Sequence, residues 1–251
     1  MGRSRRRTGS SVQRRLAALH GKALNYDPNA PHPAEDGWRI DEYCEPLPRE
    51  APGPPEDGGP FAIAQTLLRD YRVADPDIVR AYYDEDAPLE GRDMLLELRF
   101  LFFRTYAGCR VGDIVDETRE VDGRPVRVWG WPYRTLEGHV EQGEMSWEVW
   151  KWLDTGEVEF RIHSYSRLTG APNPLTRVGI RLIGQRERRR YLSSACRRIA
   201  RLTAEGLRGR HPAGAQARRD AGGDGLAADR SPARPPAALD RIGEEAVGHD
   251  R

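Results

Sequence analysis

The chain has 251 residues with 40 basic and 39 acidic side chains, and 38% of its residues are hydrophobic. This composition is typical of one ordinary folded domain with extra polar length, and it argues against two full domains. No stretch reaches the roughly eighteen uninterrupted apolar residues of a membrane span, and no apolar run follows the basic start, so we expect a cytoplasmic protein. The cysteines Cys44, Cys109 and Cys196 are far apart, which excludes a disulfide scaffold and a cysteine-rich zinc site.

Both ends of the chain differ in composition from its middle. Residues 1–22 carry seven basic and no acidic side chains, and residues 206–251 are dominated by Gly, Ala, Pro, Arg and Asp. Segments with so few large apolar side chains cannot offset their ordering entropy by burial. We therefore predict a basic flexible arm over 1–22, a single domain over 23–205 and a disordered tail over 206–251.

In chain order, the first predicted element is a short strand at 38–43, where apolar and polar residues alternate. A proline-rich connection over 46–60 separates it from two helices. The helical spacing of apolar residues predicts the first helix over 61–71. Asp75, which is followed by a proline, predicts the start of a second short helix that runs to Tyr82.

After Gly91 the apolar period changes to two, which predicts a run of strands. The turn Asp122-Gly123 joins the second and third of them, and Pro132 predicts an edge or a bulge in the third. A long helix is predicted to start at Asn173-Pro174 and to end near Glu205, before Gly206. The five strands cover residues 94–103, 110–120, 125–135, 144–154 and 157–167.

The last predicted hairpin determines which residues share a face of the sheet. A two-residue loop at Thr155-Gly156 pairs Trp150 with Arg161 and Glu144 with Arg167, on a face that we expect to be solvated. The opposite face is predicted to be buried. It contains Met145, Trp147, Val149, Lys151, Leu153, Val158, Phe160, Ile162 and Ser164.

The long helix has an apolar stripe that is interrupted near its centre by Gln185 and Arg189. A charged residue inside an apolar stripe needs a partner or a water-filled space. We therefore expect the helix to cover the sheet at both ends and to face a cavity in its middle. There, Gln185 and Arg189 either anchor the polar end of a bound molecule or pair with acidic groups of the domain.

Charge is unevenly distributed along the chain. Residues 177–210 contain eleven arginines against two glutamates, whereas residues 23–176 carry 30 acidic and 16 basic side chains. Two arginine-rich segments suggest a nucleic-acid surface, but the acidic body offers them internal counter-charge. The sequence therefore disfavours nucleic acid as a partner.

Candidate ligand-binding side chains gather in two neighbouring strands, which contain five of the six tryptophans. Such an aromatic wall is typical both of core packing and of an apolar pocket. A desolvated lysine can act as a Schiff-base nucleophile, but near a hairpin end we expect the Lys151 ammonium to reach water. The predicted ligand-binding set is Trp129, Trp131, Tyr133, Trp147, Lys151, Phe160, Gln185 and Arg189.

One short loop carries the candidate catalytic residues. His139, Glu141 and Glu144 are close together but lack the fixed helical spacing of a zinc motif, so we predict no metal site, and nothing indicates a cofactor. An imidazole beside a cavity mouth titrates in the range useful for acid–base chemistry, which makes His139 with Glu141 the candidate pair. The alternative is a turn whose polar residues cap backbone groups.

Two stretches resemble a known family. Residues 129–144, WGWPYRTLEGHVEQGE, and residues 158–167, VEFRIHSYSR, are similar to the signature Y-G-T-L-x-G-H-P-E-x-G-E … F-x-V-x-x-F-S-R of domain of unknown function 1990. The chain departs from it with Arg134 in place of a small residue and Val140 in place of proline. The resemblance extends over about residues 24–201.

The order of elements is also similar to the helix-grip fold of START-like and polyketide-cyclase-like proteins. The resemblance implies an α+β fold in which a curved antiparallel sheet surrounds a long C-terminal helix. It also implies that a small hydrophobic molecule binds between sheet and helix, and it brings no established reaction.

Three functions therefore stay open. The first is non-covalent binding of a small, largely apolar molecule. The second is a hydrolase, cyclase or isomerase that acts on such a molecule through His139 and Glu141. The third is an adaptor whose basic arm contacts an anionic partner.

Overall fold

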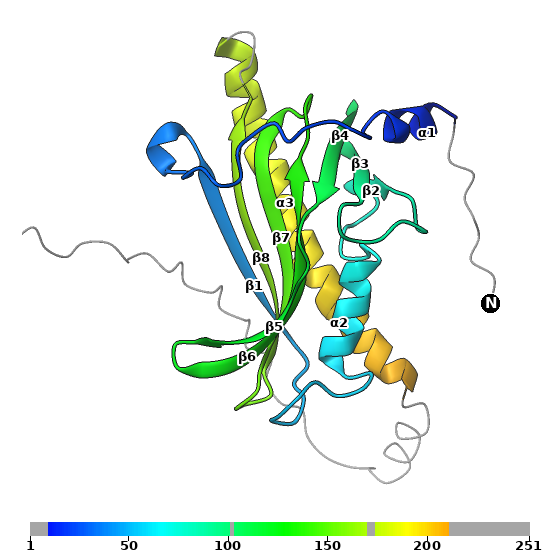
Figure 1. Ribbon diagram of the computed structural model, residues 1–251, viewed down its shortest axis with the longest axis vertical. Helices are drawn as coiled ribbons and strands as arrows, with labels where there is room; N and C mark the ends of the chain where they lie inside the picture. The colour runs from blue at the N-terminus through cyan, green and yellow to red at the C-terminus, as the bar shows by residue number, and fades with distance from the viewer. Residues whose placement is uncertain (1–9, 101–102, 170–173, 211–251) are drawn as a thin grey trace, which may run out of the picture. The chain divides into compact units, whose positions relative to one another are not determined.

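The computed structural model describes residues 10–100, 103–169 and 174–210, and Figure 1 shows how their elements are arranged. In α3, side chains are described from Arg186 to Gly209. The helices are α1 (Ser10–Ala17), α2 (Pro60–Arg69), α3 (Pro174–Arg210) and the short 3-10 helix η1 (Ala34–Asp36). The strands are β1 (Arg39–Leu47), β2 (Val79–Tyr82), β3 (Asp93–Phe100), β4 (Phe103–Val111), β5 (Val115–Val121), β6 (Arg124–Thr135), β7 (Glu141–Trp152) and β8 (Val158–Leu168).

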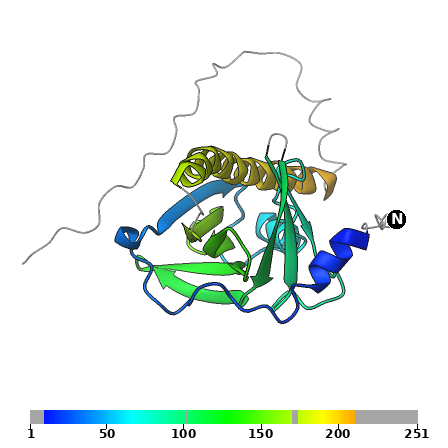
Figure 2. The ribbon, with the colours of Figure 1, turned by 90° about the horizontal axis from the view of Figure 1, so that it is seen from above.

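All of these strands belong to one antiparallel sheet with the order β1-β8-β7-β6-β4-β3-β2, and β5 pairs with β6 outside this path. Figure 2 shows the curved sheet with α3 along its open side and α2 between them. This is the predicted START-like helix-grip α+β fold. Among the described residues, no helix combines the length and hydropathy needed to cross a membrane.

The main core lies between the inner face of the sheet and the two covering helices, α2 and α3. Alternation along β6 and β7 directs Trp131 and Trp147 inward, where they pair across the two strands and are almost completely buried. Leu68 of α2 and Leu192 of α3 cover them, with no exposed surface of their own. Burying each such side chain contributes about 1.5–3 kcal/mol, so this layer fixes α3 against the sheet.

The hairpin between β7 and β8 has the predicted faces but a longer loop. Trp152 is hydrogen-bonded to Glu157, so the loop contains four residues and ends at Gly156, with φ of +75°. Two extra residues shift the register while leaving each side chain on the predicted face, because the side-chain period of a strand is two. The predicted partners were therefore wrong, since Trp150 faces Glu159 and Glu144 faces Tyr165.

The outer face of this hairpin is not simply solvated, as the sequence analysis expected. Trp150 and Trp152 are only 7% and 6% exposed and form a second apolar cluster with Val126 and Val128. Arginines cover the two indoles, with the guanidinium carbon of Arg161 4.0 Å from the centre of the Trp150 ring. Cation–π contacts thus let charged side chains shield large aromatic groups on the convex face.

Two elements of the first half differ from the prediction. Asp75 does accept hydrogen bonds from the backbone of Asp77 and Ile78, but this turn leads directly into β2 and not into a helix. Pairing with β3 outweighs a short helical pattern there. The predicted strand at 94–103 is too long, because β3 ends at Phe100 and β4 begins at Phe103. The apolar run over 100–103 contains no turn signal that would have separated them.

Four turn-forming or helix-breaking residues, Asp122, Gly123, Pro132 and Gly206, have roles that local patterns predicted only in part. Asp122 and Gly123 form the predicted turn between β5 and β6, both with positive φ. Pro132 lies at no edge but where β6 changes partner from β5 to β4. Gly206 does not end α3, which continues to Arg210; a Cβ there would lie 3.1 Å from Ile63, so glycine allows close packing on α2.

Residues 10–22, which the sequence analysis placed in a flexible arm, form α1 and a turn on the outer face of β3 and β4. Val12, Leu16 and Leu19 recur at helical spacing and face this surface. Leu19 is 5% exposed and contacts Gly108, where an added Cβ would lie 2.5 Å from its side chain. The apolar stripe thus supplies the burial that the basic composition concealed.

Candidate functional site

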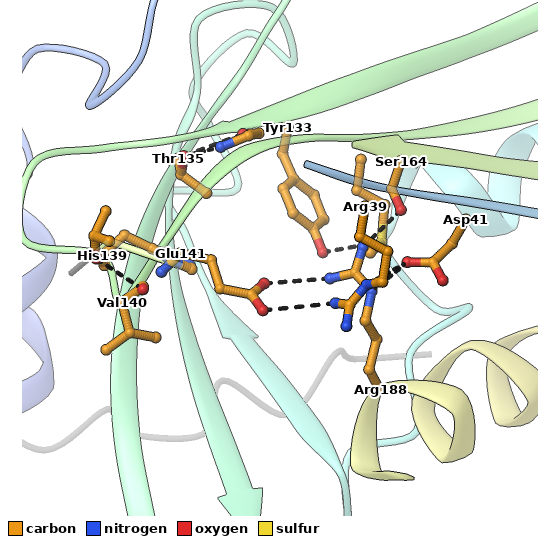
Figure 3. Close-up of polar contacts among 12 residues, drawn as sticks. Arg39, Asp41, Tyr133, Thr135, His139, Val140, Glu141, Ser164 and Arg188 are labelled. Carbon is orange, nitrogen blue, oxygen red and sulfur yellow. Dashed lines mark hydrogen bonds and ion pairs between the residues drawn. The ribbon is translucent and has the colours of Figure 1, made fainter. Parts of the chain in front are cut away.

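Charged side chains meet on the inner side of the sheet, beneath α3, at the end where β7 begins. Figure 3 shows Arg39 and Asp41 of β1, Glu141 of β7 and Arg188 of α3 converging there, next to Ser164 of β8. We call these five residues the arginine–carboxylate cluster. It connects the helix to the hairpin of β7 and β8 and to β1, which lies about a hundred residues earlier in the sequence.

Arg188 is the centre of this cluster. Its Nε donates to Asp41 Oδ2 at 2.7 Å, and its two terminal nitrogens donate to Glu141 Oε2 at 3.2 Å and Ser164 Oγ at 2.6 Å. Arg39 approaches the same two carboxylates, at 3.3 Å from Asp41 and 3.8 Å from Glu141. The two guanidinium groups and two carboxylates balance in charge.

The cluster is only partly closed. The side-chain exposure is 13% for Arg188, 20% for Asp41, 29% for Glu141 and 34% for Arg39. The Nε atom of Arg39 is buried and makes no hydrogen bond, although it lies within ion-pair distance of Asp41. Solvent therefore reaches charged groups between sheet and helix, and one buried donor makes no hydrogen bond of its own.

The loop and strand start that carry Glu141 are held by backbone constraints. Gly143 has φ of +140°, and a Cβ there would lie 2.1 Å from the carbonyl oxygen of Tyr165. Thr135 Oγ1 accepts from the Gly143 backbone N–H at 2.9 Å, and Asn25 Nδ2 donates to the Glu141 carbonyl at 3.0 Å. These contacts explain why the signature places glycine two residues after this glutamate.

His139 and Glu141, the candidate catalytic pair, meet through the backbone. The Glu141 N–H donates to His139 Nδ1 at 2.9 Å, while the Glu141 carboxylate contacts the two arginines. Burial lowers the pKa of His139 below its ordinary value, and the charge of Glu141 opposes this shift only in part. The arrangement corresponds to the capped turn of the sequence analysis, and the catalytic role stays a prediction.

Glu144, which follows His139 and Glu141 in the sequence, forms its ion pair with a different residue from the predicted one. Its Oε2 accepts from Arg134 Nε at 2.7 Å, so its partner is not Arg167. Arg134, a departure from the family signature, therefore has a defined partner. Among the described residues, no group of three or more His, Cys, Asp or Glu side chains is arranged to hold a metal ion.

The polar position of α3 is one residue away from the predicted one. Arg189 is exposed on the solvent side, whereas its neighbour Arg188 turns inward. The side chain of Gln185 lies outside the described residues. Over a helix of this length, small departures from 100° per residue are enough to change which of two adjacent arginines faces the sheet.

Lys151, predicted to extend its ammonium into water, is completely buried. Its Nζ donates to Glu50 Oε2 at 2.6 Å and to the Pro54 carbonyl at 2.8 Å. The other Glu50 oxygen accepts from the N–H of Phe61 at the start of α2, at 2.8 Å. No local pattern indicates Glu50, because its proline-rich loop folds back onto β7 only in the tertiary structure.

The remaining predicted ligand-binding residues form the aromatic wall of the core. Trp129, Trp131, Tyr133, Trp147 and Phe160 are all at most 8% exposed. The hydroxyl groups of Tyr71 and Tyr191 are 2.7 Å apart, and burial raises the pKa of Tyr191 to about 12. The indole N–H groups of Trp131 and Trp147 are buried without a hydrogen-bond partner among the described residues.

Comparison with known families tests whether the chain belongs to the family that its two signature stretches resemble. The model described as "Domain of unknown function (DUF1990)" matches residues 23–194. The chain belongs to this family. The match covers the signature loop and the end of α3 that contributes Arg188, whereas α1 precedes it. Among curated proteins, none matches the sequence.

Several solved structures are similar to this DUF1990 chain. The crystal structure of Ara h 8.0201 has a TM-score of 0.42 and 13% identity, over 67% of this chain and 99% of that one. A point mutant of Thalictrum flavum norcoclaurine synthase, in complex with a transition-state analogue, has a TM-score of 0.40 and 9% identity. The similarity extends over 67% of this chain and 95% of that one. The hypothetical protein jhp0584 from Helicobacter pylori has a TM-score of 0.34 and 13% identity, over 69% of this chain and 94% of that one.

Proposed function

We propose that this DUF1990 protein binds a small, largely apolar molecule between the inner face of the sheet and α3, beside the arginine–carboxylate cluster. One observation carries the proposal. Charged side chains in an otherwise apolar layer stay 13–34% exposed, although they lie beneath a helix. A solvent-accessible polar group next to an aromatic wall is the usual composition of a ligand site.

The charges of the cluster indicate what kind of polar group the molecule carries. Two guanidinium groups already face two carboxylates, so an anionic ligand would add an uncompensated charge. A neutral molecule with a hydrogen-bond acceptor would instead use donors that make no hydrogen bond. Arg39 Nε is one such donor, and the indole N–H groups of Trp131 and Trp147 are two more.

Native mass spectrometry of the protein purified from its own host tests the proposal directly. We expect a co-purified small molecule that organic extraction removes. The extracted protein should then show saturable quenching of tryptophan fluorescence with neutral apolar probes that carry a carbonyl group. Absence of any bound mass, together with no quenching by a broad panel of such probes, would contradict binding.

A pair of variants locates the site. Ser166→Phe adds bulk to the inner face of β8, where Ser166 is 7% exposed, and should weaken probe binding at least tenfold. His163→Phe places the same phenyl ring, in place of an imidazole, on the exposed outer face of that strand and should leave binding unchanged. Equal effects of the two variants would place the binding site elsewhere.

Catalysis by His139 and Glu141 stays an alternative with a separate test. Glu141 would act as a base only after its carboxylate leaves the two arginines. Substrate depletion in host extract should then require His139, because its imidazole is the other group of the pair that can accept and return a proton. Unchanged depletion by His139→Ala would end the catalytic alternative while leaving binding intact.

A further inference from the structure

The solvent side of α3 carries a row of exposed arginines. They recur at intervals of four and seven residues, which are the spacings that return to the same side of an α-helix. At about 100° and 1.5 Å per residue, the row occupies about 60° of the circumference and is about 33 Å long. Its members, which we call the arginine row, are Arg186, Arg190, Arg197, Arg201 and Arg208.

The arginine row lies opposite the buried side of the helix. Leu192, Ala195 and Ile199 have no exposed surface and pack on the core, on the other side of α3. Between the arginines, the outward positions are occupied by the small residues Ser193 and Ala204. The row is therefore a narrow, straight strip of guanidinium groups without large apolar side chains.

Among the described residues, the acidic body forms no ion pair with this row, although the charge of Arg197 acts on Glu45 of β1 and opposes the rise of its pKa by burial. Asp41 and Glu141 are used by Arg188, which points inward. Arg190 and Arg201 have ion pairs on the helix itself, with Glu187 and Glu205. Within the described part of the chain, the other three members of the row, Arg186, Arg197 and Arg208, make no ion pair.

We propose that the arginine row binds the phosphate backbone of a nucleic-acid duplex. A guanidinium group forms bidentate hydrogen bonds with phosphate oxygens, and a straight row of them matches a regularly spaced polyanion. A helix that binds a membrane surface inserts an apolar side, and the apolar side of α3 is buried against the sheet. The row faces away from the interior, so this activity is independent of ligand binding.

Fluorescence anisotropy of the full chain with a labelled duplex of about 20 base pairs tests the proposal. Five phosphate contacts predict a slope of log K against log salt of about −4 to −5, so affinity should fall about 250- to 1,000-fold between 50 and 200 mM salt. The triple variant R186Q/R197Q/R208Q should bind at least tenfold more weakly, with a slope shallower by about 2.5.

The control R49Q/R72Q/R104Q removes the same charge from exposed arginines outside α3 and should bind like the unchanged protein. Circular dichroism of both variants establishes that they are folded. Three results would overturn the proposal: no binding of duplex at 50 mM salt, equal losses for the two variants, or a row-dependent retention on phosphatidylserine vesicles without retention of duplex.

Discussion

Two ionic groups lie on the inner face of the same sheet, at opposite ends of β7, and they differ in almost every physical respect. At one end, Lys151 and Glu50 are 2.6 Å apart and neither side chain is exposed. At the other end, the arginine–carboxylate cluster keeps 13–34% of each charged side chain exposed. Ion pairs between basic and acidic side chains therefore occur twice, once as a sealed pair without solvent contact and once as an open cluster that solvent reaches.

The difference shows what each group does. Glu50 accepts hydrogen bonds from Lys151, Glu56 and Phe61, so it joins the proline-rich loop, β7 and the start of α2. A sealed pair of this kind fixes the chain path. The open cluster keeps a donor without a hydrogen bond and contacts solvent, so it can accept a polar group without breaking the fold.

The largest expected effect comes from breaking the sealed pair. Lys151→Met leaves the Glu50 carboxylate buried without its counter-charge, which should lower the free energy of unfolding by about 3–5 kcal/mol. Urea denaturation measures this loss. The double variant with Glu50→Gln should be less destabilised than the sum of the two single variants, because the uncompensated charge is gone. A loss below about 1 kcal/mol for Lys151→Met would contradict the structural role of the pair.

Gly143 should have the next largest effect, because it sets the path of the strand that carries Glu141. Gly143→Ala combines a positive φ with a contact between Cβ and the Tyr165 carbonyl, and should cost about 2–4 kcal/mol. Gly123→Ala is the control, since φ is also positive there but no atom lies near the added Cβ. It should cost about 1 kcal/mol, and equal losses at both sites would refute the steric argument.

Arg188 offers the direct comparison with Lys151. Arg188→Met removes the central guanidinium of the open cluster, but Arg39 stays near both carboxylates, so the expected loss is about 1–2 kcal/mol. The exposed neighbour gives the control, since Arg189→Met should change stability by less than about 0.5 kcal/mol. If Arg188→Met destabilised the protein as much as Lys151→Met, the distinction between the sealed and the open group would be lost.

The smallest expected effect is on the pH dependence of stability, and it comes from His139 near the arginine–carboxylate cluster. Because burial lowers the pKa of His139, the unfolded chain binds the proton more readily than the folded one. Stability contributed by the neutral imidazole is therefore present above about pH 6.5 and is lost as the pH falls toward the lower, folded-state pKa. His139→Gln should flatten the decrease in melting temperature between pH 7 and pH 5.5. An unchanged slope would show that His139 is not buried in solution.

Local patterns were sufficient for much of the fold. Alternation along residues 144–154 and 157–167 gave the correct faces of the central hairpin even though the loop length was wrong, because a shift by two residues preserves the face. The turn at Asp122-Gly123 was found because positive φ strongly favours these residue types. The signature around His139 and Glu141 lies at the end of the sheet where the arginine–carboxylate cluster forms.

The candidate site could be predicted only in part. Glu141 was named from its motif, but Arg39 and Asp41 lie about a hundred residues earlier, on an edge strand whose neighbour is β8. Nothing local indicates that these positions share a face with Glu141. Arg188 was missed in favour of Arg189, because the inward side of a long helix depends on the surface against which it packs.

The sequence by itself determined the antiparallel sheet with its long terminal helix, the aromatic inner face and the family, because each follows from periodicity or from a local motif. Tertiary structure alone decided which charges meet. Glu50 reaches Lys151, and Arg188 reaches Asp41 and Glu141, across separations that no local pattern spans. The physical reason is that the energy of a buried charge depends on its nearest opposite charge and on access to water, and folding sets both.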